Sequence, residues 1–311
     1  MKILFMGTPE ISAACLTAIL EDGTHAVCGV YTRADKPVGR KQILTAPPVK
    51  EVALAHQIPV FQPKTLRDGQ AEKQILEMQP DLIVVVAYGR ILPQEVLDIP
   101  RFGAINLHVS LLPKYRGAAP IQRAVLAGDV ATGVTVQQMD AGIDTGAILS
   151  VTPVDIGPGE TSGELFERMT RVGAQALIET RADIAQGTAT ATPQNNAQAT
   201  AAPMLTKEEA QFTFDASAQN LHNLVRGMNP WPVAFFLFEN KKIKVLRSVL
   251  RLDLQGKHPG EILAMKPLTV ACAQGALILE TVLPEGSRPM EGGAWAAGKR
   301  FSVGDTLMAC I

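Results

Sequence analysis

The chain has 311 residues, of which 47% are hydrophobic and 19% are charged, so it has apolar material for packed cores and length for two domains. Its 29 Lys and Arg nearly balance its 30 Asp and Glu, and the net charge of −1 excludes binding to nucleic acid through a strong overall field. No run of 18 apolar residues is present, and the apolar stretch in the opening MKILFMGTPE is too short for a signal peptide. We therefore expect a cytoplasmic protein that does not bind membranes.

Strand-like and helix-like stretches alternate in the first 140 residues. The run LIVVVAY (82–88) is typical of a strand buried on both faces. Strands are expected at 2–6, 25–32, 82–88, 104–109 and 133–139, and helices at 10–20, 49–57, 71–79 and 121–128. This alternation predicts an α/β domain with a mainly parallel sheet, in which ligands lie outside the carboxyl ends of the strands.

The later part of the chain has a different pattern. Residues 186–203, QGTATATPQNNAQATAAP, are small, polar and nearly uncharged, which is typical of a linker. A helix at 217–228 and short strands at 234–239, 243–250, 268–273 and 276–281 follow, which predicts a smaller β-barrel domain. We place the first domain at 1–189, the linker at 190–205 and the second domain at 206–311. In Asn229-Pro230-Trp231-Pro232 the prolines predict a rigid turn around a core-filling Trp231.

The stretch INLHVSLLPKYRG (105–117) carries Asn106, His108 and Ser110 at alternate positions. In a strand these side chains share one face. His108 can exchange a proton near neutral pH, and the Asn106 amide can donate to a developing oxyanion, which suits acyl or formyl transfer. The alternative is an ordinary half-buried strand with one solvated face.

Two carboxylates stand four residues apart in GVTVQQMDAGIDTGAIL (133–149). Gly142 and Gly146 lie beside Asp140 and Asp144, so the stretch predicts either a tight loop that holds a carboxylate against a ligand or a surface turn. In the first case, one of the two carboxylates orients His108. The sequence does not decide which one.

Basic residues gather in TRADKPVGRKQ (32–42), a loop that contains Lys36, Arg40 and Lys41. It either contacts the phosphates of a nucleic acid or is a solvated surface loop. A second basic turn, Lys114-Tyr115-Arg116-Gly117, is expected beside the cleft, where it can meet an anionic or aromatic ligand. The four cysteines lie far apart without metal-ligand spacing, so no metal site is predicted.

In their order and spacing these stretches resemble the methionyl-tRNA formyltransferase family, one of the families that use 10-formyltetrahydrofolate. The resemblance spans nearly the whole chain. It is carried by GTPE, PVGRK, APPVK, VVAYGRILP (85–93), INLHVSLLPKYRGAAPIQRA (105–124), TGVTVQQMDAGIDTG (132–146) and NPWP (229–232).

The resemblance implies a Rossmann-like N-terminal formyltransferase domain and a C-terminal OB-like barrel that helps to hold tRNA. The implied reaction moves the formyl group of 10-formyltetrahydrofolate, a co-substrate, to the α-amine of methionyl initiator tRNA for translation initiation, without a metal. The implied catalytic residues are Asn106, His108 and Asp144. The implied folate contacts are Ser110, Leu111, Leu112 and Pro113, and the implied tRNA contacts are Lys36, Arg40 and Lys41 within 33–48. Because no segment shows a large exposed apolar face, we expect a monomer.

The chain departs from the family pattern at two places. Val109 stands where a small residue is usual, and GRKQI stands where GRGKK is frequent, with one glycine and one cation fewer. Two alternatives stay open from the sequence. One is a formyltransferase with the same donor and an amino-sugar acceptor, and the other is a folate- or RNA-binding protein without catalysis.

Overall fold

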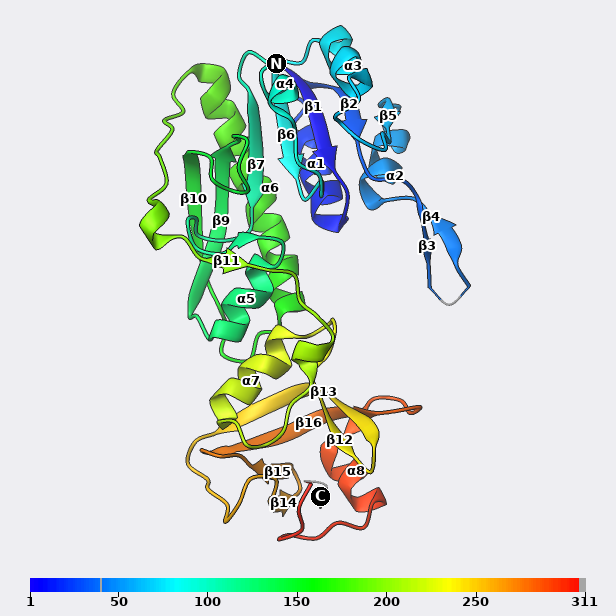
Figure 1. Cartoon of the computed structure of the whole chain (residues 1–311), viewed down its shortest axis with the longest axis vertical. Helices are drawn as coiled ribbons and strands as arrows, with labels where there is room; N and C mark the ends of the chain where they lie inside the picture. Colours follow the sequence, from blue (N-terminus) through cyan, green and yellow to red (C-terminus); the bar gives the residue numbers. More distant parts are fainter. Residues whose placement is uncertain (40, 308–311) are drawn as a thin grey trace. The chain divides into compact units, whose positions relative to one another are not determined.

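The computed structural model describes residues 1–39 and 41–307, and the chain divides into two compact units (Figure 1). The first unit contains Met1–Gly117, Thr132–Val154 and Glu167–Ala202. The second contains Ala118–Ala131, Asp155–Phe166 and the described residues from Pro203 onward. Composition along the chain predicts contiguous domains at 1–189 and 206–311, whereas these units interleave, because two earlier segments pack with the C-terminal part.

The first unit is built on a seven-stranded sheet with the order β10-β9-β7-β6-β1-β2-β5. Its strands are β1 (Lys2–Gly7), β2 (Ala26–Tyr31), β5 (Val60–Phe61), β6 (Leu82–Val86), β7 (Ala104–His108), β9 (Ala131–Gln138) and β10 (Ile148–Asp155). The pairs from β5 to β7 are parallel, and β9 runs antiparallel to β7. The predicted mainly parallel sheet is thus confirmed.

Helices pack against this sheet, and their apolar side chains form a core with those of the strands. The helices of the unit are α1 (Glu10–Asp22), α2 (Pro48–Ala55), α3 (Gln70–Met78), α4 (Gln94–Leu97) and α6 (Ser162–Gln186), the last of which begins in the second unit. Leu4 and Met6 of β1 belong to one core cluster with Ile75 of α3 and Val96 of α4. Each such fully buried side chain stabilises the fold by about 1.5–3 kcal/mol.

The 25-residue helix α6 is an element that the sequence analysis did not assign, since charged and small residues interrupt its apolar positions. Its start carries a recognisable pattern nevertheless. The Thr161 amide donates to Glu164 Oε2 (2.9 Å), and the Glu164 amide donates to Thr161 Oγ1 (3.3 Å), which is a reciprocal capping box. Farther along, a Cβ on Gly173 would lie 2.8 Å from Leu107 Cδ2, so α6 lies close against β7.

The second unit contains an antiparallel sheet with the order β12-β13-β16-β15-β14 and with β17 on β16. Its strands are β12 (Phe235–Phe238), β13 (Lys241–Arg251), β14 (Ile262–Met265), β15 (Leu268–Ala271), β16 (Ala276–Pro284) and β17 (Met290–Glu291), and its helices are α5 (Pro120–Ala127), α7 (Ala218–Gly227) and α8 (Gly292–Gly298). Phe214, Phe236 and Trp295 pack in its core. Within the described residues no pairing joins β12 to β14, so closure into an OB-like barrel stays a prediction.

Trp231 does not fill the core, and this expectation from the sequence was wrong. Its side chain is 52% exposed, whereas Trp295 is 5% exposed and takes the core position. The turn is tied to β13 by a side chain: Asn229 Nδ2 donates to the carbonyl oxygen of Leu246 (2.8 Å). The flanking prolines therefore do not place the indole in the core.

His222 on α7 is a buried histidine that ties three segments of the second unit together. Its Nε2 lies 2.9 Å from the carbonyl oxygen of Pro158, and its Nδ1 lies 2.9 Å from Ser248 Oγ on β13. A carbonyl oxygen can only accept, so Nε2 carries the proton and Nδ1 accepts from the serine hydroxyl. Burial, the largest cause, lowers the pKa of His222 below its ordinary value of 6.5, and the positive charge of Arg226 acts in the same direction.

We predict that the second unit loses stability in mild acid because of His222. Below about pH 6.5 the unfolded chain binds a proton that the folded unit resists, so the free energy of unfolding falls as the pH falls. A His222→Gln variant should lose less unfolding free energy than the wild type between about pH 7.5 and about pH 5.5. Urea unfolding followed by tryptophan fluorescence measures this, since both tryptophans lie in the second unit.

The control is His56→Gln, because His56 is an exposed histidine in the first unit. It should keep the wild-type pH dependence. An equal loss in the wild type and in His222→Gln would contradict the prediction.

Candidate functional site

Polar side chains face one another at the carboxyl end of β7. Asn106 is directly opposite Gln137 of β9, and His108 is directly opposite Thr135. Because side chains alternate along a strand, Asn106 and His108 lie on one face, as the sequence predicts. The sheet therefore brings an amide, an imidazole and a second amide to the edge where ligands bind in α/β proteins.

The loop after β9 is built by Asp140. Its Oδ1 accepts from the Gly142 amide at 3.0 Å and from Thr145 Oγ1 at 2.6 Å, so this carboxylate is used inside the loop. The backbone passes very close at Gly146, where a Cβ would lie 1.7 Å from the carbonyl oxygen of Gln138. Only glycine fits there. Of the two carboxylates left open by the sequence, Asp140 thus shapes the loop.

Asp144 is the carboxylate that points to the polar strand ends. Its Oδ2 accepts from the Gly117 amide at 2.9 Å. Its Oδ1 is shared: Gln137 Nε2 lies at 3.1 Å, Asn106 Nδ2 at 3.3 Å and His108 Nδ1 at 3.5 Å. One oxygen is therefore anchored by a short bond, and the other faces two amide donors and a histidine nitrogen at longer distances.

The ring of His108 is held in one orientation. Its Nε2 lies 2.8 Å from the carbonyl oxygen of Tyr115, which can only accept, so Nε2 carries a proton. Nδ1 then faces Asp144 Oδ1, and the histidine side chain is only 6% exposed. This nitrogen and the carboxylate oxygen together form a place that can accept a proton and hold it.

Ser110 uses both its hydroxyl and its carbonyl group inside the protein. It lies beyond the end of β7, its Oγ donates to the carbonyl oxygen of Lys114 (2.6 Å), and its own carbonyl oxygen accepts from Thr135 Oγ1 (2.7 Å). Leu112 is buried, whereas Leu111 and Pro113 are half-buried and offer apolar surface. The folate contacts of Ser110, Leu111, Leu112 and Pro113 stay a prediction.

Arg116 also has a different role from the one expected of its basic turn. Its Nε and Nη2 donate to Gln194 Oε1 at 3.1 and 2.7 Å, and Nη2 donates to Asn196 Oδ1 at 2.8 Å. The guanidinium is thus engaged inside the first unit instead of being presented to an anionic ligand.

The segment expected to be a linker supplies these partners. Thr192 pairs with Ile148, and β11 (Ala201–Ala202) pairs in parallel with β8 (Arg116–Gly117). Gln137 and Gln194 are site residues that sequence reasoning missed. The alternation in VTVQQM could have shown that Gln137 shares a strand face with Thr135, but the polar composition around Gln194 carries no such sign.

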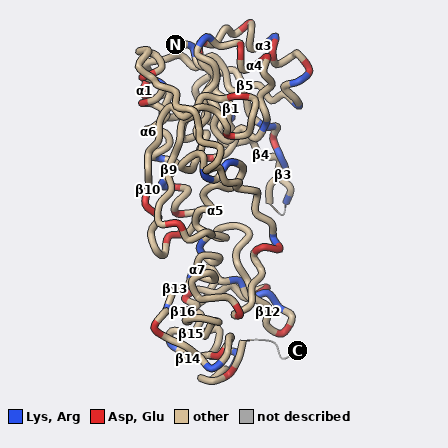
Figure 2. The backbone as a smooth tube through the Cα atoms, turned by 60° about the vertical axis from the view of Figure 1, so that its left-hand side comes forward, with Lys and Arg blue, Asp and Glu red and all other residues tan. Residues whose placement is uncertain are grey.

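The basic loop forms a hairpin of β3 (Lys36–Val38) and β4 (Ile43–Thr45), and Figure 2 colours its described Lys residues blue. Lys36 and Lys41 are exposed, whereas Arg40 lies outside the described residues. Three apolar side chains of the hairpin are exposed by 55–67%: Val38, Ile43 and Leu44. The hairpin therefore presents cations and apolar groups together, as a surface that docks on another molecule does.

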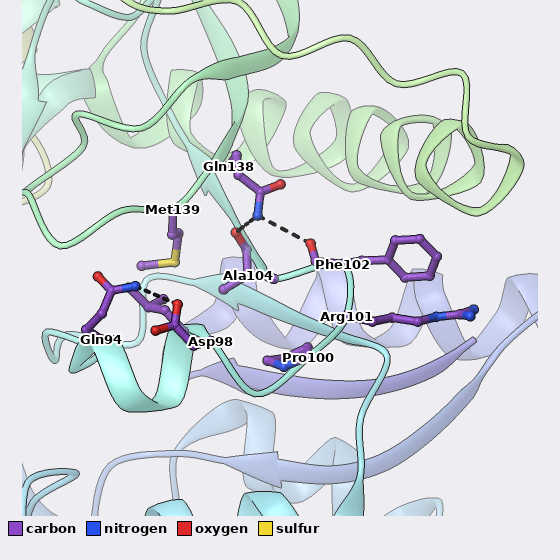
Figure 3. Close-up of a pocket in the computed structure, with 10 residues that line it drawn as sticks. Gln94, Asp98, Pro100, Arg101, Phe102, Ala104, Gln138 and Met139 are labelled. Carbon is purple, nitrogen blue, oxygen red and sulfur yellow. Dashed lines mark hydrogen bonds between the residues drawn. The ribbon is translucent and has the colours of Figure 1, made fainter.

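A cavity of about 440 Å³ lies at the opposite end of β7, before Ala104 (Figure 3). Its polar groups bind one another: Gln138 Nε2 donates to the carbonyl oxygens of Phe102 and Ala104, and Gln94 donates to Asp98. This cavity is separate from the carboxyl end of β7.

In residues 1–39 and 41–307, no group of three or more His, Cys, Asp or Glu side chains is arranged to hold a metal ion. The described helices include none with the length and apolar character needed to span a membrane.

Comparison with known proteins agrees with this architecture. The family model for formyl transferase matches residues 1–180, and the model for the formyl transferase C-terminal domain matches residues 204–300. Among solved structures, the fold is similar to that of the N-formyltransferase from Helicobacter canadensis in complex with folinic acid and dTDP-3-aminofucose. The TM-score is 0.67 at 19% identity, over 89% of this chain and 97% of that one, which shows a shared fold.

Two curated relatives are much closer in sequence. The chain is 44% identical over 310 residues to a methionyl-tRNA formyltransferase from Alkaliphilus oremlandii, with 99% of each chain covered. It is 45% identical over 312 residues to a methionyl-tRNA formyltransferase from Symbiobacterium thermophilum, with 97% of this chain and 95% of the relative covered. The chain therefore belongs to the formyl transferase family and, within it, to the methionyl-tRNA formyltransferases.

Proposed function

We propose that this enzyme uses Asn106, His108 and Asp144 to transfer the formyl group of 10-formyltetrahydrofolate to the α-amine of methionyl initiator tRNA. The product is formylmethionyl-tRNA for translation initiation. The observation that carries the residue assignment is the convergence of Asn106 Nδ2 and His108 Nδ1 on Asp144 Oδ1, at 3.3 and 3.5 Å. The trio lies at the carboxyl end of the sheet, where the fold places its ligands.

The reaction begins with the neutral amine, whose nitrogen attacks the formyl carbon of the folate co-substrate. A carbon–nitrogen bond forms, and the formyl oxygen becomes an oxyanion in a tetrahedral centre. The Asn106 amide stabilises that oxygen by a hydrogen bond, and protonated His108 contributes only its positive charge, because Tyr115 and Asp144 face its two ring nitrogens. The bond from the formyl carbon to N10 of the folate then breaks, N10 takes the proton that the attacking amine has given up to the enzyme, and tetrahydrofolate leaves.

The proton lost by the attacking amine needs an acceptor. Because the Tyr115 carbonyl keeps the proton on His108 Nε2, the basic nitrogen of this ring is Nδ1, on the side of Asp144. Proton uptake there gives an imidazolium whose Nδ1–H faces Asp144 Oδ1. The 3.5 Å separation is longer than an ordinary hydrogen bond, and catalytic contacts of this kind tighten when substrate binds.

The acceptor is expected to contact the β3–β4 hairpin. The exposed Lys36 and Lys41, together with Arg40, are the proposed contacts to tRNA phosphates. The high identity to the tRNA enzymes over full length favours this acceptor over the amino-sugar alternative, because the sugar enzyme from Helicobacter canadensis shares only 19% of the sequence. The presence of the whole catalytic trio favours catalysis over folate or RNA binding alone. We also propose that the enzyme is monomeric and cytoplasmic.

Replacement of Asn106 by alanine should lower kcat for formylation by roughly 10²–10³-fold, because an oxyanion donor is lost. The KM values for both substrates should change little, since this donor acts mainly in the transition state. Steady-state kinetics with methionyl initiator tRNA measures both quantities. Asn220→Ala on α7 is the control, because Asn220 is an exposed amide of the second unit. A loss below about threefold in a folded Asn106→Ala protein would remove the proposed role.

Removal of the hairpin cations should act on tRNA binding instead. In the double variant Lys36→Ala/Lys41→Ala, and in Arg40→Ala, KM for methionyl-tRNA should rise while KM for 10-formyltetrahydrofolate stays the same. Each lost phosphate contact should also lower the slope of log affinity against log salt by about 1. The matched control is Lys73→Ala, an exposed lysine on α3. An unchanged KM together with an unchanged salt slope in the hairpin variants would exclude the assignment.

A further inference from the structure

The side chain of Gln194 connects two loops of the active site. Its Nε2 lies 2.9 Å from the carbonyl oxygen of Asp144 and 2.7 Å from that of Gly146. Its Oε1 accepts the two hydrogen bonds from Arg116. Since a guanidinium only donates and a carbonyl only accepts, these four contacts fix which end of the amide is Oε1 and which is Nε2. One side chain thus joins the Asp144 loop to the Arg116 segment.

Both ends of the Gln194 side chain contact segments that orient His108 and Asp144. Arg116 stands between Tyr115, whose carbonyl oxygen accepts from His108 Nε2, and Gly117, whose amide donates to Asp144 Oδ2. Holding Arg116 in place therefore fixes the backbone groups that orient the histidine and the carboxylate. At the other end, Gln194 binds the main chain of Asp144 itself.

The backbone at Asp144 needs such support. Its φ of +53° lies in the left-handed region, which is unfavourable for residues other than glycine. A non-glycine residue keeps that conformation where surrounding contacts over-determine it. The two bonds from Gln194 Nε2 bracket this residue, because they go to its own carbonyl and to the carbonyl two residues later.

The segment around Gln194 is itself tied to the active-site loops. The Arg116 amide donates to the carbonyl oxygen of Thr200 (2.8 Å), and the Tyr115 amide donates to Thr200 Oγ1 (2.8 Å). At Gly117 a Cβ would lie 2.8 Å from the carbonyl oxygen of Ala202, so the two chains pass in close contact. The segment of 190–202 is thus a fixed part of the first unit, from which Gln194 can position other groups.

We infer that Gln194 is a positioning residue for formyl transfer: it holds the Asp144 loop and the Arg116 segment in the arrangement that aligns Asp144 with His108 and Asn106. It touches none of the reacting atoms and acts through Asp144. The inference rests on the proposed catalytic role of that trio.

Two variants and one control separate this role from a general structural one. Gln194→Glu keeps an oxygen that accepts from Arg116 but replaces the NH₂ group that donates to Asp144 and Gly146 by a second oxygen. Gln194→Ala removes both the accepting oxygen and the donating NH₂ group. Asn195→Ala is the control, since the Asn195 side chain accepts from the Ala197 amide of the same segment. Both Gln194 variants should lose roughly 10- to 100-fold in kcat with KM values within about twofold, and the control should keep wild-type kinetics.

A second measurement does not depend on activity. In protein labelled with ¹⁵N-histidine, the His108 ring resonances, assigned by their absence in His108→Gln, should shift in Gln194→Glu and stay in place in Asn195→Ala. Wild-type kcat in Gln194→Glu, a loss confined to KM, or unmoved His108 resonances would overturn the inference. If the wild type fails to formylate methionyl-tRNA, the proposed function fails, while the His108 resonances still decide whether Gln194 positions the trio.

Discussion

The carboxylate of Asp144 is the point on which the polar groups of the first unit converge. It receives contacts from β7 through Asn106 and His108, from β9 through Gln137 and from the backbone at Gly117. A carboxylate with 15% exposure has to find donors in the protein, since each missing one costs about 1–3 kcal/mol. That requirement couples the strand register, the loop conformation and the orientation of the histidine to one another.

The two oxygens of this carboxylate are used differently. Oδ2 is fixed by the 2.9 Å bond from Gly117, whereas the contacts of Oδ1 with Asn106 and His108 are 3.3 and 3.5 Å long. A rigid anchor on one side and loose contacts on the other give a group that keeps its place while its partners change during a reaction. The buried surroundings strengthen any charge interaction that forms there. This asymmetry supports the proposal that His108 Nδ1, beside Oδ1, takes up the proton.

Several features of the fold follow from local sequence alone. The Val/Ile run of β6 predicts a strand buried on both faces, and all five of its residues are buried. The alternation in INLHVS predicts that Asn106 and His108 share a face. Where local patterns are ambiguous, prediction fails: Trp231 is exposed, and a stretch with linker composition is paired with β8 and Ile148. Composition reports how a segment interacts with water, but it does not report which backbone groups lie beside it.

The sequence by itself determined the class of fold, the family and the residue types available for formyl transfer, because these depend on periodicity, order and spacing along the chain. Spacing alone did not choose between Asp140 and Asp144, since both are acidic residues in the same glycine-rich loop, and only the family resemblance pointed to Asp144. Tertiary structure decided their contacts: Asp140 binds groups within its own loop, whereas Asp144 lies beside Asn106 and His108. The role of Gln194 was likewise decided by tertiary structure, because its partners Arg116 and Asp144 are 78 and 50 residues away and only the folded chain brings them together.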